Sequence, residues 1–388
     1  MPVEQQHLHL AAALDGVGWH PADAVKPDAS PGEEFTLDYW TGLVQEAEAG
    51  FLDFLTIEDP LSRRPSNDLE PDEQRGPVKR RLDAVLLAGA MTPFTQHIGL
   101  VPTIVVNHAQ PAFAAKAIAS LDHLTGGRAG WRTQQAAVRP IPIADLFSPE
   151  VQAMLAVVFD RSADLVRVVR ALWDGVEDER ALRELAPGRF APIAGSPAAQ
   201  DQPGSADDWI IVPYPSTAPR PPQGHPVIFT LAHIDIPHRF GARAADVVAV
   251  TPHSAPEAEA TVREIRAYQA AAGRSDEIVH VFADLVVFID PEPGAAAARR
   301  ERLDQALGRT YASDAEIIAG TPSEVASLML DWQRAGITGF RLRPGTLPHD
   351  LSQITRELVP ELQRRGAFRT GYKDGTLRET LGLRPPRP

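Results

Sequence analysis

Runs of consecutive apolar residues alternate along most of this chain with stretches whose apolar residues recur at helical spacing. Short apolar runs bounded by glycine, proline or polar residues predict buried strands, and recurrence every three to four residues predicts amphipathic helices. Strands that alternate with helices form parallel sheets with right-handed crossovers. The alternation therefore predicts an α/β protein built on a parallel sheet.

Eight such units favour closure into a (β/α)8 TIM barrel over an open doubly wound sheet. The expected strands are residues 8–14, 52–57, 98–106, 128–134, 227–231, 246–250, 280–289 and 339–342. The expected helices are residues 35–49, 80–90, 110–124, 149–173, 255–272, 296–308, 323–335 and 347–365.

Two segments depart from the alternation. Residues 186–226 are rich in proline, glycine and serine, which predicts an insertion between two barrel units. Residues 372–388 form a tail that is ordered only if it docks on the rest of the protein. A length of 388 residues fits one barrel domain with insertions, spanning residues 1–388.

Composition excludes several classes of function. The chain has no cysteine, so disulfides, thiolate metal sites and cysteine nucleophiles are ruled out. Its net charge of −13 disfavours nucleic acid and anionic membranes as main partners. We find no signal peptide, no apolar run of about 18 residues that could span a membrane, and no metal-binding cluster, and expect a cytoplasmic protein.

One long segment carries a family resemblance. Residues 97–131, HIGLVPTIVVNHAQPAFAAKAIASLDHLTGGRAGW, resemble the signature of the bacterial-luciferase-like flavin-dependent monooxygenases, in particular the nitrilotriacetate and dibenzothiophene-sulfone monooxygenase branch. Further matching motifs, in chain order, are GWHP (18–21), FLTIED (54–59), VVRALWDG (168–175), PPQGHPVI (221–228), AGTPSEVA (319–326), GFRL (339–342), LVPELQRRGAFR (358–369) and DGTLRETLGLRPPRP (374–388).

The resemblance implies a function and its partners. Members of this family bind reduced FMN, supplied by a separate flavin reductase, at the C-terminal mouth of the barrel. There the flavin reacts with O2 to form a peroxyflavin that oxygenates a small organic substrate. The flavin carries the chemistry, and the protein supplies position and electrostatics. A homodimer is also expected from the resemblance.

Matching positions predict site residues. Asp59 follows the second strand, where barrel active sites lie, although a helix cap or an ion pair with Arg63 or Arg64 explains it too. Thr103 matches a family threonine beside the flavin ring, although strand propensity also favours threonine. Both are expected cofactor contacts.

Two histidines are candidate catalytic residues. His20 lies after the first strand and His108 after the third. A histidine there can donate or accept a proton near neutral pH. The alternative for each is a solvated surface histidine.

Other cofactor positions depart from the family pattern. Arg132 and Gln134 replace the usual small polar residues of the fourth strand, and Phe159 stands where the family has a phosphate-binding tyrosine. Ala232 and His233 occupy the position of a glycine- and serine-rich phosphate loop. Arg132 fits an anionic ligand, or alternatively an ion pair with Asp59 or another barrel carboxylate.

These departures leave three functions open. The first is the FMN-dependent two-component monooxygenase. The second is a deazaflavin-dependent oxidoreductase of the same superfamily. The third is a subunit or binding protein that keeps the barrel but binds no flavin. Fold alone does not choose among the three, because one fold can carry many functions.

Overall fold

The computed structural model describes residues 7–25, 32–60, 80–136, 145–175, 181, 184–186 and 219–386. Most of the insertion predicted at residues 186–226 lies outside these ranges, as do Arg63 and Arg64. No helix in these ranges is long and apolar enough to cross a bilayer.

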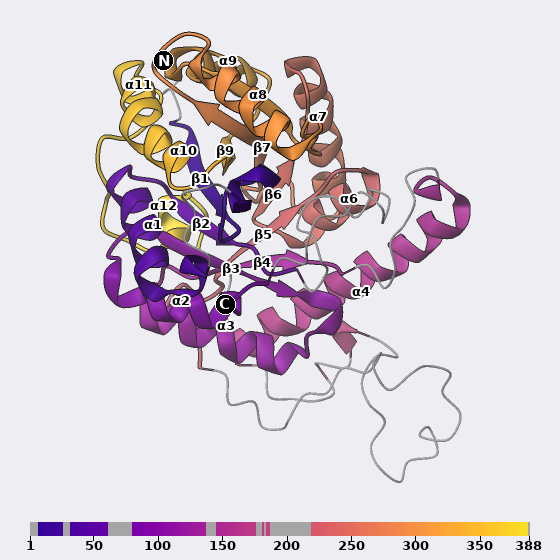
Figure 1. Ribbon diagram of the computed structural model, residues 1–388. Helices are drawn as coiled ribbons and strands as arrows, with labels where there is room; N and C mark the ends of the chain where they lie inside the picture. The colour runs from indigo at the N-terminus through magenta and orange to yellow at the C-terminus, as the bar shows by residue number, and fades with distance from the viewer. Residues whose placement is uncertain are drawn as a thin grey trace, which may run out of the picture.

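Eight parallel strands close into a barrel that helices surround (Figure 1). β1 pairs with both β2 and β9, and β6 pairs with β7, which completes the ring. The predicted (β/α)8 fold is confirmed. Around the barrel, the strands are β1 (His9–Leu14), β2 (Phe54–Ile57), β3 (Gly99–Val105), β4 (Gly130–Gln134), β5 (Val227–Leu231), β6 (Val247–Val250), β7 (His280–Ile289) and β9 (Gly339–Pro344).

A ninth strand, β8 (Glu316–Gly320), was not predicted. It pairs in parallel with residues 285–289 of β7, beyond residues 280–283, where β7 pairs with β6. Its apolar core is only three residues long and ends at a glycine, so sequence periodicity gives little signal for it.

The helices match the predicted ones in most places. They are α1 (Leu37–Ala49), α2 (Ala84–Met91), α3 (Pro111–Thr125), α4 (Pro149–Trp173), α6 (Asp235–Ala244), α7 (Ala255–Ala271), α8 (Ala295–Leu307), α9 (Pro322–Arg334), α10 (His349–Gln353), α11 (Val359–Arg364) and α12 (Leu377–Thr380). Helix α6 was not predicted. The helix expected at residues 347–365 is divided by a π-helical turn, Ile354–Leu358.

Local signals explain several of the helix ends. Ser148 caps α4 by accepting a hydrogen bond from the amide of Val151, and Thr321 and Glu324 form a capping box at α9. Helix α3 ends at Gly126, whose φ of 65° a residue with a side chain rarely adopts. The segment SLDHLTGGR, residues 120–128, thus contains the end of a helix.

The tail closes the N-terminal end of the barrel. Three leucines of the tail pack against inward-facing residues near the N-terminal ends of the strands, including Phe54 and Phe282. These leucines are Leu377, Leu381 and Leu383. The backbone of the tail is also held, because His280 of β7 is hydrogen-bonded to the carbonyl of Leu381 at 2.7 Å. The tail is therefore part of the core.

Candidate functional site at the barrel mouth

Alternate residues of each strand face the barrel interior, and near the C-terminal ends many of these residues are charged. Arg341 of β9 lies between two carboxylates: its Nε is 2.9 Å from Asp284 Oδ1 of β7, and its Nη1 is 2.9 Å from Glu58 Oε1, just past β2. Arg343 extends this series of ion pairs, with Nε 2.8 Å from Asp284 Oδ2 and Nη1 2.7 Å from Asp314 Oδ1.

Arg132 completes this network from β4. Its Nη2 lies 3.0 Å from Glu58 Oε2. Three guanidiniums therefore face three carboxylates inside the barrel. A buried charge is tolerated only when it is paired and hydrogen-bonded, and here each arginine has a carboxylate partner.

The pKa shifts follow from this pairing. Burial alone would raise the pKa of Asp284, but the guanidiniums of Arg341 and Arg343 outweigh it and hold the pKa below its usual range. Burial lowers the pKa of Arg132 to about 10, and the charge of Glu58 opposes the shift. Asp284 and Arg132 therefore keep their charges at neutral pH.

Three predicted cofactor contacts come together at Arg132. Its Nη1 donates to Thr103 Oγ1 at 3.2 Å and to Gln134 Oε1 at 2.6 Å. Thr103 Oγ1 in turn donates to the carbonyl of Ile57 at 2.7 Å. The Nε of Arg132 is buried and has no hydrogen-bond partner among the residues described.

Asp59 lies apart from this group. Its Oδ2 accepts a hydrogen bond from the amide of Ala84 at 3.1 Å, at the start of α2. Burial raises its pKa. The carboxylate that pairs with Arg132 is the preceding residue, Glu58, and not Asp59.

The two candidate catalytic histidines differ in their surroundings. The imidazole of His20 is fully buried, its Nδ1 accepts from the amide of Ala22 at 3.1 Å, and its Nε2 lies 3.0 Å from Asp304 Oδ1. Burial lowers its pKa, so the neutral form is favoured and both nitrogens are occupied by protein groups. His108 is exposed in a 3-10 turn directly after β3.

Phe159 and Ala232 occupy structural positions. Phe159 lies on α4 outside the barrel, with its ring 5.6 Å from that of Phe240 on α6. Ala232 is buried, and its amide donates to the carbonyl of Ala249 at 2.8 Å. Neither side chain joins the network at Arg132.

His233 stands at the mouth directly after β5. Its Nδ1 is 3.1 Å from Thr251 Oγ1 and 3.5 Å from Asp314 Oδ2, so it joins the far end of the charged network. Next along the chain, α6 begins at Asp235, whose carboxylate pairs with Arg239 at 2.7 Å and accepts from the hydroxyl of Tyr268.

Sequence reasoning missed most of the charged network. A usable signal was present, because Arg341 and Arg343 are two residues apart at the end of a strand, as are Thr56 and Glu58. That spacing places both side chains of a pair on one face. No described group of three or more histidine, aspartate or glutamate side chains could hold a metal ion.

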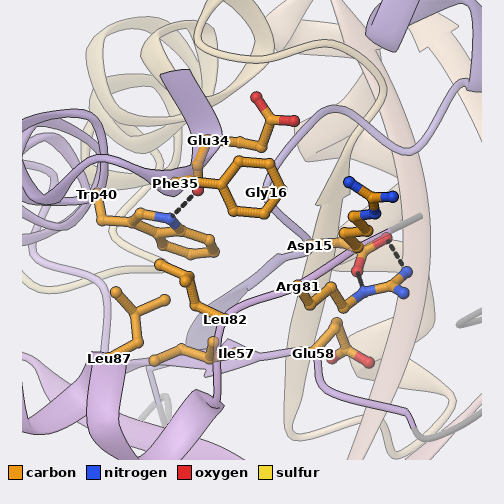
Figure 2. Close-up of a pocket in the computed structure, with 11 residues that line it drawn as sticks. Asp15, Gly16, Glu34, Phe35, Trp40, Ile57, Glu58, Arg81, Leu82 and Leu87 are labelled. Carbon is orange, nitrogen blue, oxygen red and sulfur yellow. Dashed lines mark hydrogen bonds and ion pairs between the residues drawn. The ribbon is translucent and has the colours of Figure 1, made fainter. Parts of the chain in front are cut away.

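A small cavity lies beside Glu58 (Figure 2). Arg81 reaches across it to Asp15, with Nε 2.6 Å from Oδ1. The cavity has a volume of about 10 Å³, which accommodates roughly one water molecule. Between the described residues, this cavity has no room for an organic ligand.

Comparisons with known proteins identify relatives that cover nearly the whole chain. The chain is 28% identical to nitrilotriacetate monooxygenase component A of Aminobacter aminovorans, over 99% of this chain and 98% of that protein. It is 25% identical to dibenzothiophene-sulfone monooxygenase of Rhodococcus erythropolis (strain XP), over 99% and 98%. The structure of EDTA monooxygenase from Chelativorans sp. BNC1 has the same fold, with a TM-score of 0.73, 23% identity and coverage of 98% of this chain and 99% of that one.

The family assignment rests on a match along most of the chain. Residues 18–316 match the model of the family described as luciferase-like monooxygenase. This protein therefore belongs to the luciferase-like monooxygenase family and is an enzyme, an oxidoreductase of the flavin-dependent class.

Proposed function

We propose that this chain is the oxygenating component of a two-component monooxygenase that uses reduced FMN, O2 and a small organic substrate. The name of the Aminobacter relative, component A, supports a separate partner, which we assign as a flavin reductase in the same cytoplasm. Bound reduced flavin supplies the electrons that activate O2. The protein's own residues bind and orient the reactants and manage protons.

The observation that carries this proposal is the unsatisfied donor of Arg132. Its Nε is buried without a partner among the described residues, while Glu58, Thr103 and Gln134 fix the rest of the guanidinium. A buried donor without an acceptor costs about 1–3 kcal/mol. The carbonyl and ring-nitrogen acceptors of an isoalloxazine are of the kind that would satisfy this donor, which supports a flavin ring at this end of the mouth.

The start of α6 does not fit the flavin phosphate. Helix N-termini favour anions, but here the first helical residue is Asp235, a carboxylate of the same sign as phosphate. The N-cap, Ile234, offers no side-chain hydrogen bond. We therefore propose that the flavin is held mainly by its ring and exchanges readily, as a flavin delivered by a reductase must.

An exposed apolar face supports the homodimer that we also propose. Phe35, Leu37, Leu82 and Leu86 are 38–76% exposed and line a groove of about 280 Å³ on α2 and its neighbours. Contiguous exposed apolar patches mark protein interfaces. Leu86→Glu should convert a dimer into a monomer in analytical ultracentrifugation, whereas Leu124→Glu, at the exposed end of α3, should not.

An anaerobic titration tests the cofactor. We expect reduced FMN to bind, followed by flavin reoxidation when O2 is admitted in a stopped-flow instrument. A clear preference for a deazaflavin in a parallel titration would assign the second function. Failure to bind any flavin, together with stabilisation of a co-expressed active partner, would instead assign a supporting subunit.

A further inference from the structure

Two histidines follow neighbouring strands at the mouth and pair with two carboxylates of one short segment. His233, after β5, lies 3.5 Å from Asp314, and His253, after β6, lies 2.7 Å from Glu316. Asp314 and Glu316 are two residues apart, where the chain enters β8. This arrangement depends on the strand that the sequence did not predict.

The partners of His233 fix which nitrogen carries the proton. Asp314 is ionised, because Arg343 holds its pKa well below the usual range although burial alone would raise it. An ionised carboxylate only accepts hydrogen bonds, and Thr251 Oγ1, at 3.1 Å from the same Nδ1, can accept as well. The negative charge of Asp314 beside Nδ1 therefore favours the neutral tautomer that carries its proton on Nδ1 and has a lone pair on Nε2.

The described residues leave the Nε2 lone pair of His233 without a hydrogen-bond partner, and the side chain is 43% exposed. His20 contrasts with it, because both of its nitrogens have protein partners and its side chain has no exposure.

The neutral form of the His233 imidazole is favoured mainly by its removal from water. Partial removal from water lowers its pKa; Arg343 and Arg341 act in the same direction, and Asp314 and Asp284 oppose them. A neutral histidine with a free lone pair is a proton acceptor near neutral pH. Asp314 then stabilises the imidazolium once the proton has been taken up.

We propose that His233 exchanges protons with the reactants at the mouth, and that Asp314 is its positioning residue. Nε2 takes a proton from an acidic group of a bound reactant, which leaves that reactant one proton poorer and His233 as an imidazolium. The imidazolium returns the proton to an oxygen product or to water, which restores the starting form. This role rests on the proposed flavin-dependent function.

The tautomer is measurable without any ligand. We expect ¹⁵N NMR of the full-length protein to show His233 with its proton on Nδ1, and Asp314→Asn to move population towards the Nε2-protonated form. Circular dichroism reports whether Asp314→Asn is folded. If Asp314→Asn is not folded, the test rests on the NMR spectrum of the wild-type protein alone. A proton on Nε2 of His233 in the wild type overturns the proposal.

Kinetics test the role itself. The probe is reoxidation of bound reduced FMN by O2, which gives FMN and H2O2, followed from pH 5.5 to 8. General acid–base groups contribute about 10²–10⁴-fold, so we expect His233→Ala to slow this step at least about tenfold and imidazole to restore part of the rate. His253→Ala is the matched control, since its side chain is 51% exposed and pairs with the partly buried Glu316.

The outcomes separate this role from the proposed function. If wild-type protein binds no flavin, the proposed function fails, although the tautomer can still be read. If flavin binds and reoxidises but His233→Ala behaves like His253→Ala, the role of His233 fails and the proposed function stands.

Discussion

Arg132 and Glu58 form an ion pair inside the barrel, with 3.0 Å between Nη2 and Oε2 and side chains only 3% and 0% exposed. Glu58 also pairs with Arg341, so one carboxylate neutralises parts of two guanidiniums. Removing a partner from such a pair leaves a charge buried without compensation.

Glu58→Gln should therefore be strongly destabilising. Loss of one partner of a buried ion pair costs about 3–5 kcal/mol, so the free energy of unfolding should fall by about that amount. Urea denaturation of both proteins measures it. Glu316→Gln, which disrupts a pair that is largely accessible to water, should change the free energy of unfolding by less than about 1 kcal/mol. Equal effects of the two substitutions would contradict the network described for the barrel.

The start of α6 leads to a prediction about flavin choice. Because Asp235 is the first residue of α6, FMN should gain little over riboflavin, and we expect their Kd values to agree within about tenfold. Asp235→Asn should tighten FMN about two- to fivefold, since a charge at a helix N-terminus contributes about 0.3–1 kcal/mol, and should leave riboflavin unchanged. Fluorescence titration measures both, with Glu259→Gln on α7 as the control. A preference for FMN above a hundredfold in the wild type would show that the phosphate has a dedicated site.

His280 makes stability depend on pH. Burial lowers the pKa of its imidazole to about 4, below the usual value of 6.5. The folded protein thus favours neutral His280. The contribution of this histidine to the free energy of unfolding is therefore fully present above pH 6.5 and is lost as the pH falls towards 4. The difference corresponds to about 3 kcal/mol. His280→Asn should flatten the fall in the free energy of unfolding between pH 6.5 and 4, whereas the same change at the exposed His108 should leave the slope as in the wild type.

The docked tail should contribute directly to stability. Leu381 is 1% exposed, so Leu381→Ala should lower the free energy of unfolding by about 2–5 kcal/mol through lost burial and a new cavity. Leu124, which is 65% exposed, provides the matched leucine-to-alanine control and should show an effect below about 1 kcal/mol. If both substitutions had the same small effect, the tail would not be part of the folding unit.

The sequence was sufficient for the barrel because apolar runs and helical spacing are local properties. It located α4 at residues 149–173, since Ser148, Pro149 and the apolar repeat act together. It missed β8, whose strand character depends on pairing with β7, and α6, where Pro237 and Gly241 weaken the helical pattern.

The site was harder to predict because its geometry depends on contacts between distant strands. Thr103, Arg132 and Gln134 were recognised individually and lie together in the structure. The carboxylate that pairs with Arg132 is Glu58, whereas the sequence motif indicated its neighbour Asp59. Which of the two side chains points into the barrel and which points towards α2 depends on the orientation of the backbone after β2, which the sequence does not reveal. The role of Asp314 depends on the long β7–β8 connection, which no local pattern specifies.

Leu377, Leu381 and Leu383 of the C-terminal tail fill the N-terminal end of the barrel. Among the described residues, these leucines cover this end of the barrel against Phe54 and Phe282. Under the proposed function, flavin, substrate and product would therefore enter and leave at the opposite end. Release of the oxidised flavin would then have to precede binding of the next reduced flavin, and the turnover rate would depend on that release.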